Sequence, residues 1–152
     1  MMSAYLGRPN ETSELIWQDE RGRTFIRSGD IGCQDEDGYL KLVDRKKDMI
    51  ISGGFNVFPS DLEEIIGQHP DVLDATVIGV PHERWGETPL ALIILRPGAV
   101  FDSSAMLPWC NQRLAKHQRL SNIETRQDFP RNALGKVLKR VLREPYWKNE
   151  KS

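Results

Sequence analysis

The sequence predicts an α+β fold, with a β-rich segment over residues 1–43 and a small domain over residues 44–152. Three observations support this prediction. Short runs of strand character alternate with Asp and Gly turns before residue 44. A glycine pair at 53 and 54 separates two apolar runs. Two runs rich in β-branched residues, 72–80 and 90–95, lie among segments with helical spacing, which indicates a hairpin and a short sheet covered by helices.

The β-rich segment is expected to hold three short strands, at residues 15–17, 24–27 and 39–43. The second strand follows the turn DERG and the third follows DEDG, in which Asp and Gly favour turn conformations. The run VDRKKDM comes next and sets three cations between two aspartates, which suits a surface joint better than a core. We therefore place the domain boundary at Asp44.

The second domain should begin with a hairpin whose strands are residues 49–52 and 55–58. In the helix that follows, Ser60 and Glu63 have the spacing of a capping box, and the helix should end near His69 and Pro70.

The β-branched runs 72–80 and 90–95 are the next expected strands, separated by the polar loop PHERWGET. A helix over 103–119 follows, and Pro108 inside this range suggests a later start. A strand over 123–126 and a last helix from Gly135 complete the domain.

Charge is unevenly distributed in this chain of 152 residues, which is 39% hydrophobic, 28% charged and of net charge −1. Residues 1–43 carry 5 Lys/Arg and 8 Asp/Glu, residues 44–110 carry 5 and 10, and residues 111–152 carry 11 and 4, giving −3, −5 and +7. The basic end suits phosphates, nucleic acid or an anionic surface, and equally an ordinary solvated helix face. No aromatic interleaving or recognition motif favours nucleic acid.

Cysteine usage and hydropathy indicate a soluble protein of a reducing cytoplasm. Cys33 and Cys110 are far apart and lack metal-ligand spacing, so we expect neither a disulfide framework nor a metal site. The longest apolar stretch, residues 89–95, is too short to span a bilayer. Peripheral membrane association, oligomeric state and whether Met1 is a natural start are left open.

Two motifs carry functional information, VDRKKDMIISGGFNVFPSDLEEI and PRNALGKVLKR. Together they resemble the C-terminal part of the adenylate-forming acyl-CoA synthetases, and the first looks most like the fatty-acyl-CoA ligases. The resemblance covers almost the whole chain. It implies that residues 44–152 are a mobile lid domain and that residues 1–43 are the end of a large N-terminal domain.

Lys136 is the candidate catalytic residue. When a carboxylate attacks ATP, negative charge develops at the α-phosphate, and an ammonium brought there stabilises it without proton transfer. The family motif Pro-Lys-Thr-x-x-Gly-Lys supplies such a lysine, and it corresponds here to residues 130–136, with mild departures at Arg131 and Asn132. On its own, a Gly-Lys pair after a turn would more often be a solvated lysine.

Three residues near the boundary resemble the family's nucleotide and hinge residues. Asp30, in RSGDIG, matches the Asp that holds the adenosine ribose, because a carboxylate can accept hydrogen bonds from two vicinal hydroxyls. Arg45 resembles the arginine that contacts the ribose or phosphates of the adenylate. Asp44 resembles the hinge about which the lid rotates. The simpler interpretations are a turn for Asp30 and a surface pair for Asp44 and Arg45.

Gly53 and Gly54 resemble the glycines that the pantetheine arm of coenzyme A passes closely, since only glycine leaves room there. Trp85, in HERWGE, belongs to a motif that accompanies this family and could equally be a packing residue. We interpret His69 and His82 as structural. The cations after Lys136 that could meet the nucleotide part of coenzyme A are Lys139, Arg140 and Arg143.

The implied function is that of the C-terminal portion of an ATP-dependent fatty-acid–CoA ligase acting through acyl-AMP, inactive alone. Its expected substrates are ATP, coenzyme A and a fatty acid, and its partner is the N-terminal adenylation domain of the same enzyme. The Mg²⁺ ligands and the acyl pocket would lie in that N-terminal domain. Two alternatives remain: an adenylation lid that loads a carrier protein, and a non-catalytic module that binds a nucleotide or partner.

Overall fold

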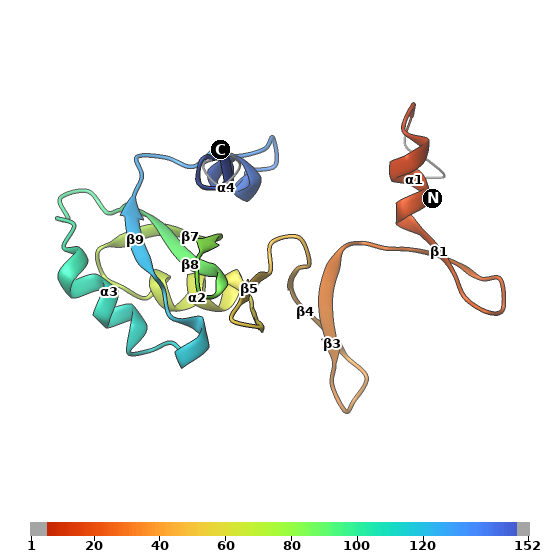
Figure 1. Cartoon of the computed structure of the whole chain (residues 1–152), viewed down its shortest axis with the longest axis horizontal. Helices are drawn as coiled ribbons and strands as arrows, with labels where there is room; N and C mark the ends of the chain where they lie inside the picture. The colour runs from red at the N-terminus through yellow and green to blue at the C-terminus, as the bar shows by residue number, and fades with distance from the viewer. Residues whose placement is uncertain (1–5, 149–152) are drawn as a thin grey trace. The chain divides into compact units, whose positions relative to one another are not determined.

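The computed structural model describes residues 6–148 and divides the chain into two compact units, Met1–Lys46 and Lys47–Ser152. We call them the N-terminal and the C-terminal unit (Figure 1).

Residues 6–46 of the N-terminal unit form one short helix and two separate two-stranded antiparallel sheets, β1 with β2 and β3 with β4. The elements are α1 (Pro9–Leu15), β1 (Ile16–Gln18), β2 (Thr24–Ile26), β3 (Asp30–Gln34) and β4 (Leu40–Arg45). The three expected strands are present with small shifts in their ends. Helix α1 and strand β3 were not expected, although Pro9 in the first turn of α1 is a recognised start signal.

The N-terminal unit has no hydrophobic core of its own. None of the residues described in it, 6–46, is fully buried. Its large apolar side chains are exposed instead, and they come from both hairpins: Ile16, Trp17, Phe25, Ile26, Tyr39, Leu40 and Leu42.

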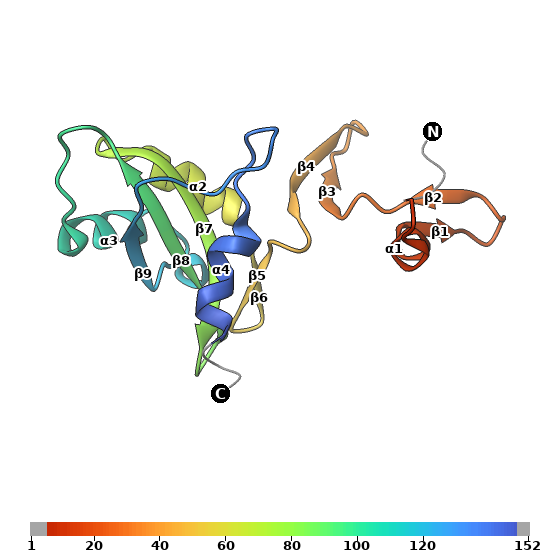
Figure 2. The same cartoon turned by 90° about the horizontal axis from the view of Figure 1, so that it is seen from above.

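The C-terminal unit is built on a five-stranded sheet of order β6-β5-β8-β7, with β9 parallel to β8 (Figure 2). The strands are β5 (Ile50–Ser52), β6 (Phe55–Val57), β7 (Val72–His82), β8 (Gly86–Leu95) and β9 (Asn122–Thr125). The expected polar loop over 81–88 is wrong in extent. The β7–β8 ladder continues to the pair His82 and Gly86, because backbone pairing does not need apolar side chains.

Three helices cover this sheet: α2 (Pro59–Gly67), α3 (Ser103–Asn111) and α4 (Lys139–Lys148). The expected Ser60–Glu63 capping box is absent, since α2 starts at Pro59 with Phe58 as N-cap and has no side-chain cap. The second helix starts at Ser103, capped by the Asp102 carboxylate, so Pro108 did not delay its start. It ends at Asn111 rather than 119, and a short 3₁₀ turn, η1 (Lys116–Gln118), follows.

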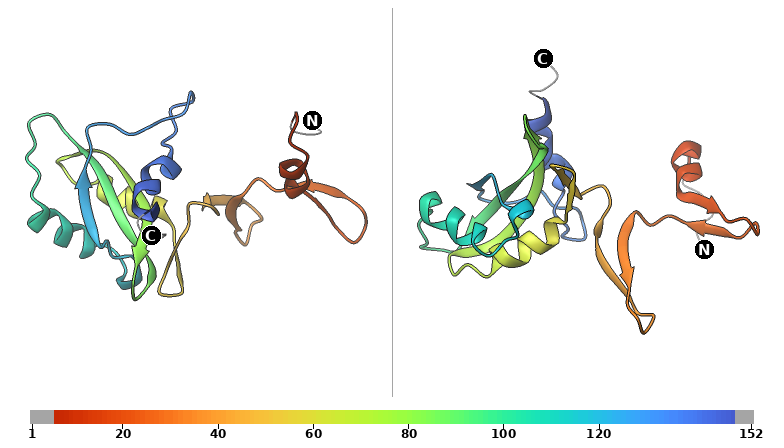
Figure 3. Two further views of the ribbon diagram at one scale, coloured as in Figure 1. Left: turned by 45° about the horizontal axis from the view of Figure 1, so that its top comes forward. Right: turned by 60° about the horizontal axis from the view of Figure 1, so that its bottom comes forward.

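The two faces of the sheet carry different helices (Figure 3). Alternate residues of β7 and β8 point to opposite faces. Val77, Ala91 and Ile93 join the larger cluster, which includes buried residues of α2 and α3. Leu90 and Leu92 join the second cluster, against which residues of α4 pack. The α+β fold with helices over a short sheet is therefore confirmed.

A polar network ties α4 to β9. The Tyr146 hydroxyl and the Arg126 guanidinium donate to the same Glu124 oxygen, at 2.7 and 2.8 Å. Burial alone would raise the pKa of the Glu124 carboxyl, but these two donors outweigh burial and lower it below its ordinary value. Burial, together with the bond to Glu124, raises the pKa of Tyr146.

Because of the Glu124 network, the free energy of unfolding of the C-terminal unit should decrease at low pH. Because the folded pKa of Glu124 is depressed, its contribution is complete above the unfolded pKa of about 4.3 and is lost as pH falls through the folded value. We expect the urea midpoint of unfolding to fall as the pH is lowered below about 4.3. The fall should be smaller in Glu124→Gln than in the unmodified protein. Urea titrations followed by circular dichroism test this; equal pH dependence of both proteins would contradict it.

Candidate functional site

Lys136 lies in a tight turn ahead of α4. The expectation that Lys136 starts the last helix is wrong, because α4 begins at Lys139. Residues 131 and 137 form an isolated antiparallel bridge, and the Lys136 carbonyl accepts from the Asn132 N–H at 2.9 Å. Gly135 supplies the positive φ of 80° that this reversal needs. No carboxylate in residues 6–148 pairs with the exposed Lys136 ammonium.

Asp30, Asp44 and Arg45 come together on the β3–β4 hairpin of the N-terminal unit. Asp30 is paired with Arg45 across the ladder, and Ile31 is paired with Asp44. The Arg45 Nε lies 3.4 Å from the Asp30 Oδ1. A carboxylate that accepts hydroxyls and a guanidinium that binds phosphate thus lie side by side. Asp44 and Arg45 belong to a strand, and the Asp44 carboxylate accepts from the Arg45 N–H at 2.7 Å.

Gly53 and Gly54 form the turn of the β5–β6 hairpin, both with positive φ, 57° and 85°. The Gly53 N–H donates to the Trp85 carbonyl at 3.0 Å. The Trp85 ring lies so close that a Cβ on Gly53 would be 2.8 Å from it, whereas a Cβ on Gly54 would have nothing within 4 Å. Gly53 is therefore a packing requirement of this unit, and Gly54 leaves open space in front of its backbone.

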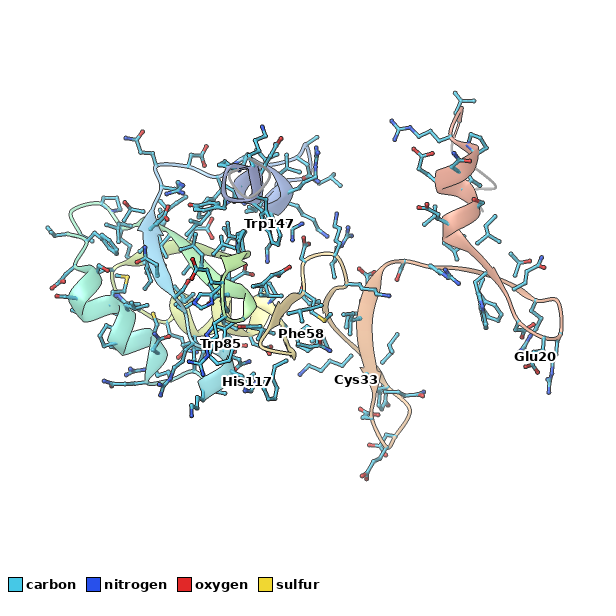
Figure 4. The ribbon with its side chains drawn as sticks, viewed as in Figure 1. Glu20, Cys33, Phe58, Trp85, His117 and Trp147 are labelled. Atoms are coloured by element: carbon cyan, nitrogen blue, oxygen red, sulfur yellow. The ribbon has the colours of Figure 1, made fainter. Side chains whose placement is uncertain are left out.

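A pocket of about 540 Å³ adjoins this hairpin. Its position follows from the sheet: β5 pairs with β8 at Gly86, and β9 pairs with the same strand from Leu90 onward. The pocket lies beside the part of β8 between these two pairings, and Thr88 of that part lines it. Trp85 and His117 both line it (Figure 4), and His117 stacks on Phe55 with ring centroids 5.2 Å apart.

The pocket combines aromatic faces with positive charge. Lys116 and Arg119 line it beside His117, and none of the Asp or Glu side chains within residues 6–148 does. Cations bind phosphate, and aromatic faces stack on a planar base. The sequence interpretation missed this group, although the run KHQR ahead of an expected strand was a visible signal. His82 also lines the pocket, and its Nδ1 accepts from the N–H groups of the 83–85 turn.

The Lys136 turn and the glycine turn lie at opposite ends of β7. Arg131 of the Lys136 turn pairs with Asp74, near the start of the strand. Gly53 contacts Trp85, in the turn that follows His82 at the end of the strand. His82 follows Asp74 by eight positions along the strand, which corresponds to roughly 26 Å at about 3.3 Å per residue. One placement of this unit cannot bring both turns to the same point.

Lys139 is a structural residue rather than a free cation. Its ammonium lies 2.8 Å from the Glu63 carboxylate and is only 17% exposed. Glu63 also accepts from the Thr76 hydroxyl at 3.0 Å and from the Val77 N–H at 2.8 Å, so it joins α2, β7 and α4. This role replaces the expected helix cap of Glu63. Arg143 reaches the Lys47 carbonyl at 3.5 Å.

Removal of the Glu63 carboxylate should destabilise the C-terminal unit. Glu63→Ala leaves the buried Thr76 hydroxyl and the Val77 N–H without their acceptor, which costs about 1–3 kcal/mol. The exposed neighbour Glu64 is the matched control, and Glu64→Ala should change stability by less than about 0.5 kcal/mol. Urea unfolding measures both, and equal losses in the two variants would contradict the assigned role.

Cys33 is exposed and Cys110 is buried, and both are free; burial raises the pKa of the Cys110 thiol to about 11. Residues 6–148 contain no cluster of three His, Cys, Asp or Glu side chains that could hold a metal ion. Within the same range, no helix has the length and apolarity needed to cross a membrane.

Comparison with known proteins defines the class. Residues 61–136 match the model of the AMP-binding enzyme C-terminal domain, and the chain belongs to this family. It is 43% identical to a 2-succinylbenzoate–CoA ligase of Geobacillus kaustophilus over 97% of this chain and 29% of the relative. It is 39% identical to a long-chain-fatty-acid–CoA ligase of Mycobacterium tuberculosis over 96% of this chain and 28% of the relative.

Among solved structures, ATP-bound MatB of Rhodopseudomonas palustris aligns with a TM-score of 0.81 at 38% identity, over 94% of this chain and 28% of that one. Apo MatB of the same organism aligns with a TM-score of 0.67 at 38% identity, over 96% and 28%. The chain thus spans less than a third of the relatives' length. The resemblance to the C-terminal part of adenylate-forming acyl-CoA ligases is confirmed, including the lid fold.

Proposed function

We propose that this chain is the C-terminal portion of an ATP-dependent fatty-acid–CoA ligase that acts through an acyl-AMP intermediate and that it is inactive alone. The observation that carries the proposal is the placement of two chemically different turns at opposite ends of one strand. One turn presents an ammonium that pairs with no carboxylate of residues 6–148, and the other presents an open glycine backbone beside a basic, aromatic pocket. A ligase with two half-reactions needs both of these elements.

In the first half-reaction, Lys136 meets the α-phosphate of ATP. The ammonium stabilises the charge that develops as the carboxylate oxygen attacks and pyrophosphate leaves. Its side chain is free to do so, since it is exposed and unpaired within residues 6–148. Fixing the backbone of Lys136 in a hydrogen-bonded turn reduces the ordering required when ATP binds.

The β3–β4 hairpin holds the adenosine side of the same nucleotide. Asp30 accepts hydrogen bonds from the two ribose hydroxyls, and Arg45 contacts the ribose or phosphate region. Their pairing at 3.4 Å keeps the two side chains oriented before the nucleotide binds. A surface ion pair of this kind adds little stability by itself, so its value lies in positioning.

In the second half-reaction, the lid rotates about Asp44, withdraws Lys136 and brings the glycine turn to the adenylate. Asp44 lies in the final residues of β4, beside the division between the two units at Lys46 and Lys47.

Coenzyme A then approaches past Gly54, and its thiol attacks the acyl carbonyl while AMP leaves. Pantetheine can pass close to the backbone there because no side chain lies within 4 Å of the Gly54 Cβ direction. The adjoining pocket, with Lys116, Arg119 and stacked His117 and Phe55, suits the phosphates and base of the nucleotide part. Lys139 does not serve this purpose, because Glu63 holds it.

The acid and Mg²⁺ belong to the part of the enzyme beyond this chain. Mg²⁺ would neutralise phosphate charge there, and its ligands are expected in the N-terminal adenylation domain. The exposed apolar hairpins of the N-terminal unit fit a surface that this domain covers. The sequence pattern and the long-chain-fatty-acid–CoA ligase among the relatives favour a fatty acid. The free cysteines suit a reducing cytoplasm.

A carrier-protein-loading adenylation lid is the second candidate, because it shares the same lid chemistry. The basic pocket favours free coenzyme A, whose nucleotide carries phosphates that a carrier-bound pantetheine lacks. Competition between the two thiols in the complete enzyme distinguishes these functions. A non-catalytic nucleotide-binding module would bind nucleotide but support neither half-reaction.

The inactivity of the isolated chain is tested by assaying residues 1–152 with ATP, Mg²⁺, a fatty acid and coenzyme A. We expect no acyl-CoA above background, because Lys136 has no acyl pocket to act on. The complete enzyme, assayed in parallel, should release AMP and pyrophosphate in proportion to acyl-CoA. Acyl-CoA formation by the isolated chain would overturn the claim that it depends on the N-terminal domain.

A further inference from the structure

We propose that Asn132, Arg131 and Asp74 are positioning residues that hold Lys136 in place for adenylation. The inference rests on the proposed role of Lys136 and adds the device that orients it. The Asn132 and Arg131 side chains bind the backbone of the Lys136 turn, and the Asp74 carboxylate binds the Arg131 guanidinium and so joins the turn to strand β7.

Asn132 closes the turn around Lys136 from both sides. Its Oδ1 accepts from the Lys136 N–H at 2.9 Å and from the Leu134 N–H at 3.0 Å. Its own N–H donates to the Lys136 carbonyl at 2.9 Å. Both backbone groups of Lys136 are therefore bound by one residue, which fixes the direction in which the lysine side chain leaves the turn.

Arg131 connects the turn to the sheet. One guanidinium nitrogen, Nη1, donates to the Gly135 carbonyl at 2.8 Å, and the other, Nη2, donates to the Asp74 carboxylate in β7. A planar guanidinium can span two acceptors in this way, and a lysine ammonium offers no such fixed fork. The residue before Lys136 is thus held at a set place relative to β7.

The two ends of the turn are anchored in the core. Phe129 is only 2% exposed and belongs to the apolar cluster under α4, and Val137 packs against the same cluster. Between these anchors the turn has little support from packing, since Leu134 is 87% exposed and nothing lies within 4 Å of the Gly135 Cβ direction. The side-chain bonds of Arg131 and Asn132 therefore supply the rigidity.

The test uses the complete enzyme with Asn132→Ala, Arg131→Gln, Asp74→Asn and Asn132→Thr. Adenylation is measured by ATP–pyrophosphate exchange, and thioester formation by supplying acyl-adenylate and coenzyme A. We expect the first two variants to lower the adenylation kcat by about 10- to 100-fold, because a displacement of about 1 Å suffices for such a loss. Asp74→Asn should give a smaller loss in the same step. Asn132→Thr should retain most of the adenylation rate, because the threonine hydroxyl can accept a backbone N–H bond in the same turn.

Asn111→Ala is the matched control. Asn111 closes a different loop with the same chemistry, accepting from the Leu120 N–H at 2.8 Å and donating to the Leu120 carbonyl at 3.1 Å. Its loss should lower stability and leave adenylation unchanged. Hydrogen exchange of the Lys136 amide in residues 1–152 adds a readout independent of activity, and it should accelerate in Asn132→Ala but not in Asn111→Ala.

The outcomes separate this inference from the proposed function. If Lys136→Ala leaves adenylation intact, the role of Lys136 fails and the positioning role falls with it. If Lys136→Ala abolishes adenylation while Asn132→Ala and Arg131→Gln do not reduce it, only the positioning inference is overturned. Equal loss of both half-reactions in Asn132→Ala, without rescue by Asn132→Thr, would likewise show a merely structural role.

Discussion

Lys136→Ala in the complete enzyme should lower adenylation by about 10²–10³-fold, the loss typical when a preorganised group facing transition-state charge is removed. Thioester formation from supplied acyl-adenylate should stay within about twofold of the unmodified enzyme's rate. A loss confined to adenylation would show that the Lys136 ammonium acts only in that step. The reason is geometric: the Lys136 turn and the glycine turn lie at opposite ends of β7, so in the proposed mechanism only one of them can act in each step.

The control for Lys136→Ala is Lys148→Ala. Lys148 is an exposed lysine of α4 whose ammonium pairs with Glu144 at 3.0 Å, so its removal subtracts the same charge from the same basic end. This variant should retain both half-reactions. If Lys148→Ala impaired adenylation as much as Lys136→Ala, net positive charge rather than a specific ammonium would account for the effect. Equal loss of both steps in Lys136→Ala would count against the assigned role.

Gly54→Ala should impair the opposite half-reaction. A Cβ there meets no atom of this unit within 4 Å, so a loss of thioester formation reports the close approach of coenzyme A. We expect that step to fall by about 10²-fold, as for a small misplacement of reacting groups, with adenylation retained. Gly53→Ala should impair the step as well, through displacement of the Trp85 ring that a Cβ would approach to 2.8 Å.

Backbone strain needs its own control, because Gly54 has a φ of 85° that other residues adopt at a cost of about 1–2 kcal/mol. Gly98 provides it: its φ is 84°, nothing lies within 4 Å of its Cβ direction, and it lies in the loop after β8. Gly98→Ala should lose similar stability while retaining both half-reactions. A thioester defect of equal size in Gly98→Ala would attribute the Gly54 effect to strain alone.

The sequence predicted those parts of the fold that depend on local pattern. The glycine turn and the strand runs 72–80 and 90–95 were placed well, because turn chemistry and β-branched residues act over a few positions. Element ends were less predictable. Ser60 and Glu63 fit a capping pattern, but Pro59 starts the helix one residue earlier, and Glu63 is used by Thr76 and Val77 of a distant strand.

The candidate site shows the same division between local and long-range information. Lys136 and the glycine pair were identified from motifs, and their roles stay predictions until tested. The bond from Arg131 to Asp74 could not be predicted, because it joins residues 57 positions apart. The basic pocket could not be predicted either, because its lining comes from segments about 30 residues apart that meet only through tertiary packing. Lys139 looked free in sequence for the same reason, since its partner Glu63 lies on another helix.

The central claim is that these residues act as the lid of an acid–CoA ligase. The direct test replaces the matching segment of the 2-succinylbenzoate–CoA ligase of Geobacillus kaustophilus, 43% identical to this chain, with residues 1–152. Formation of 2-succinylbenzoyl-CoA is then measured with ATP and coenzyme A. We expect the chimera to carry out both half-reactions with the acid specificity of the host. In the chimera, Lys136→Ala should abolish adenylation and leave thioester formation from supplied acyl-adenylate intact. A folded chimera that supports neither half-reaction would contradict the account.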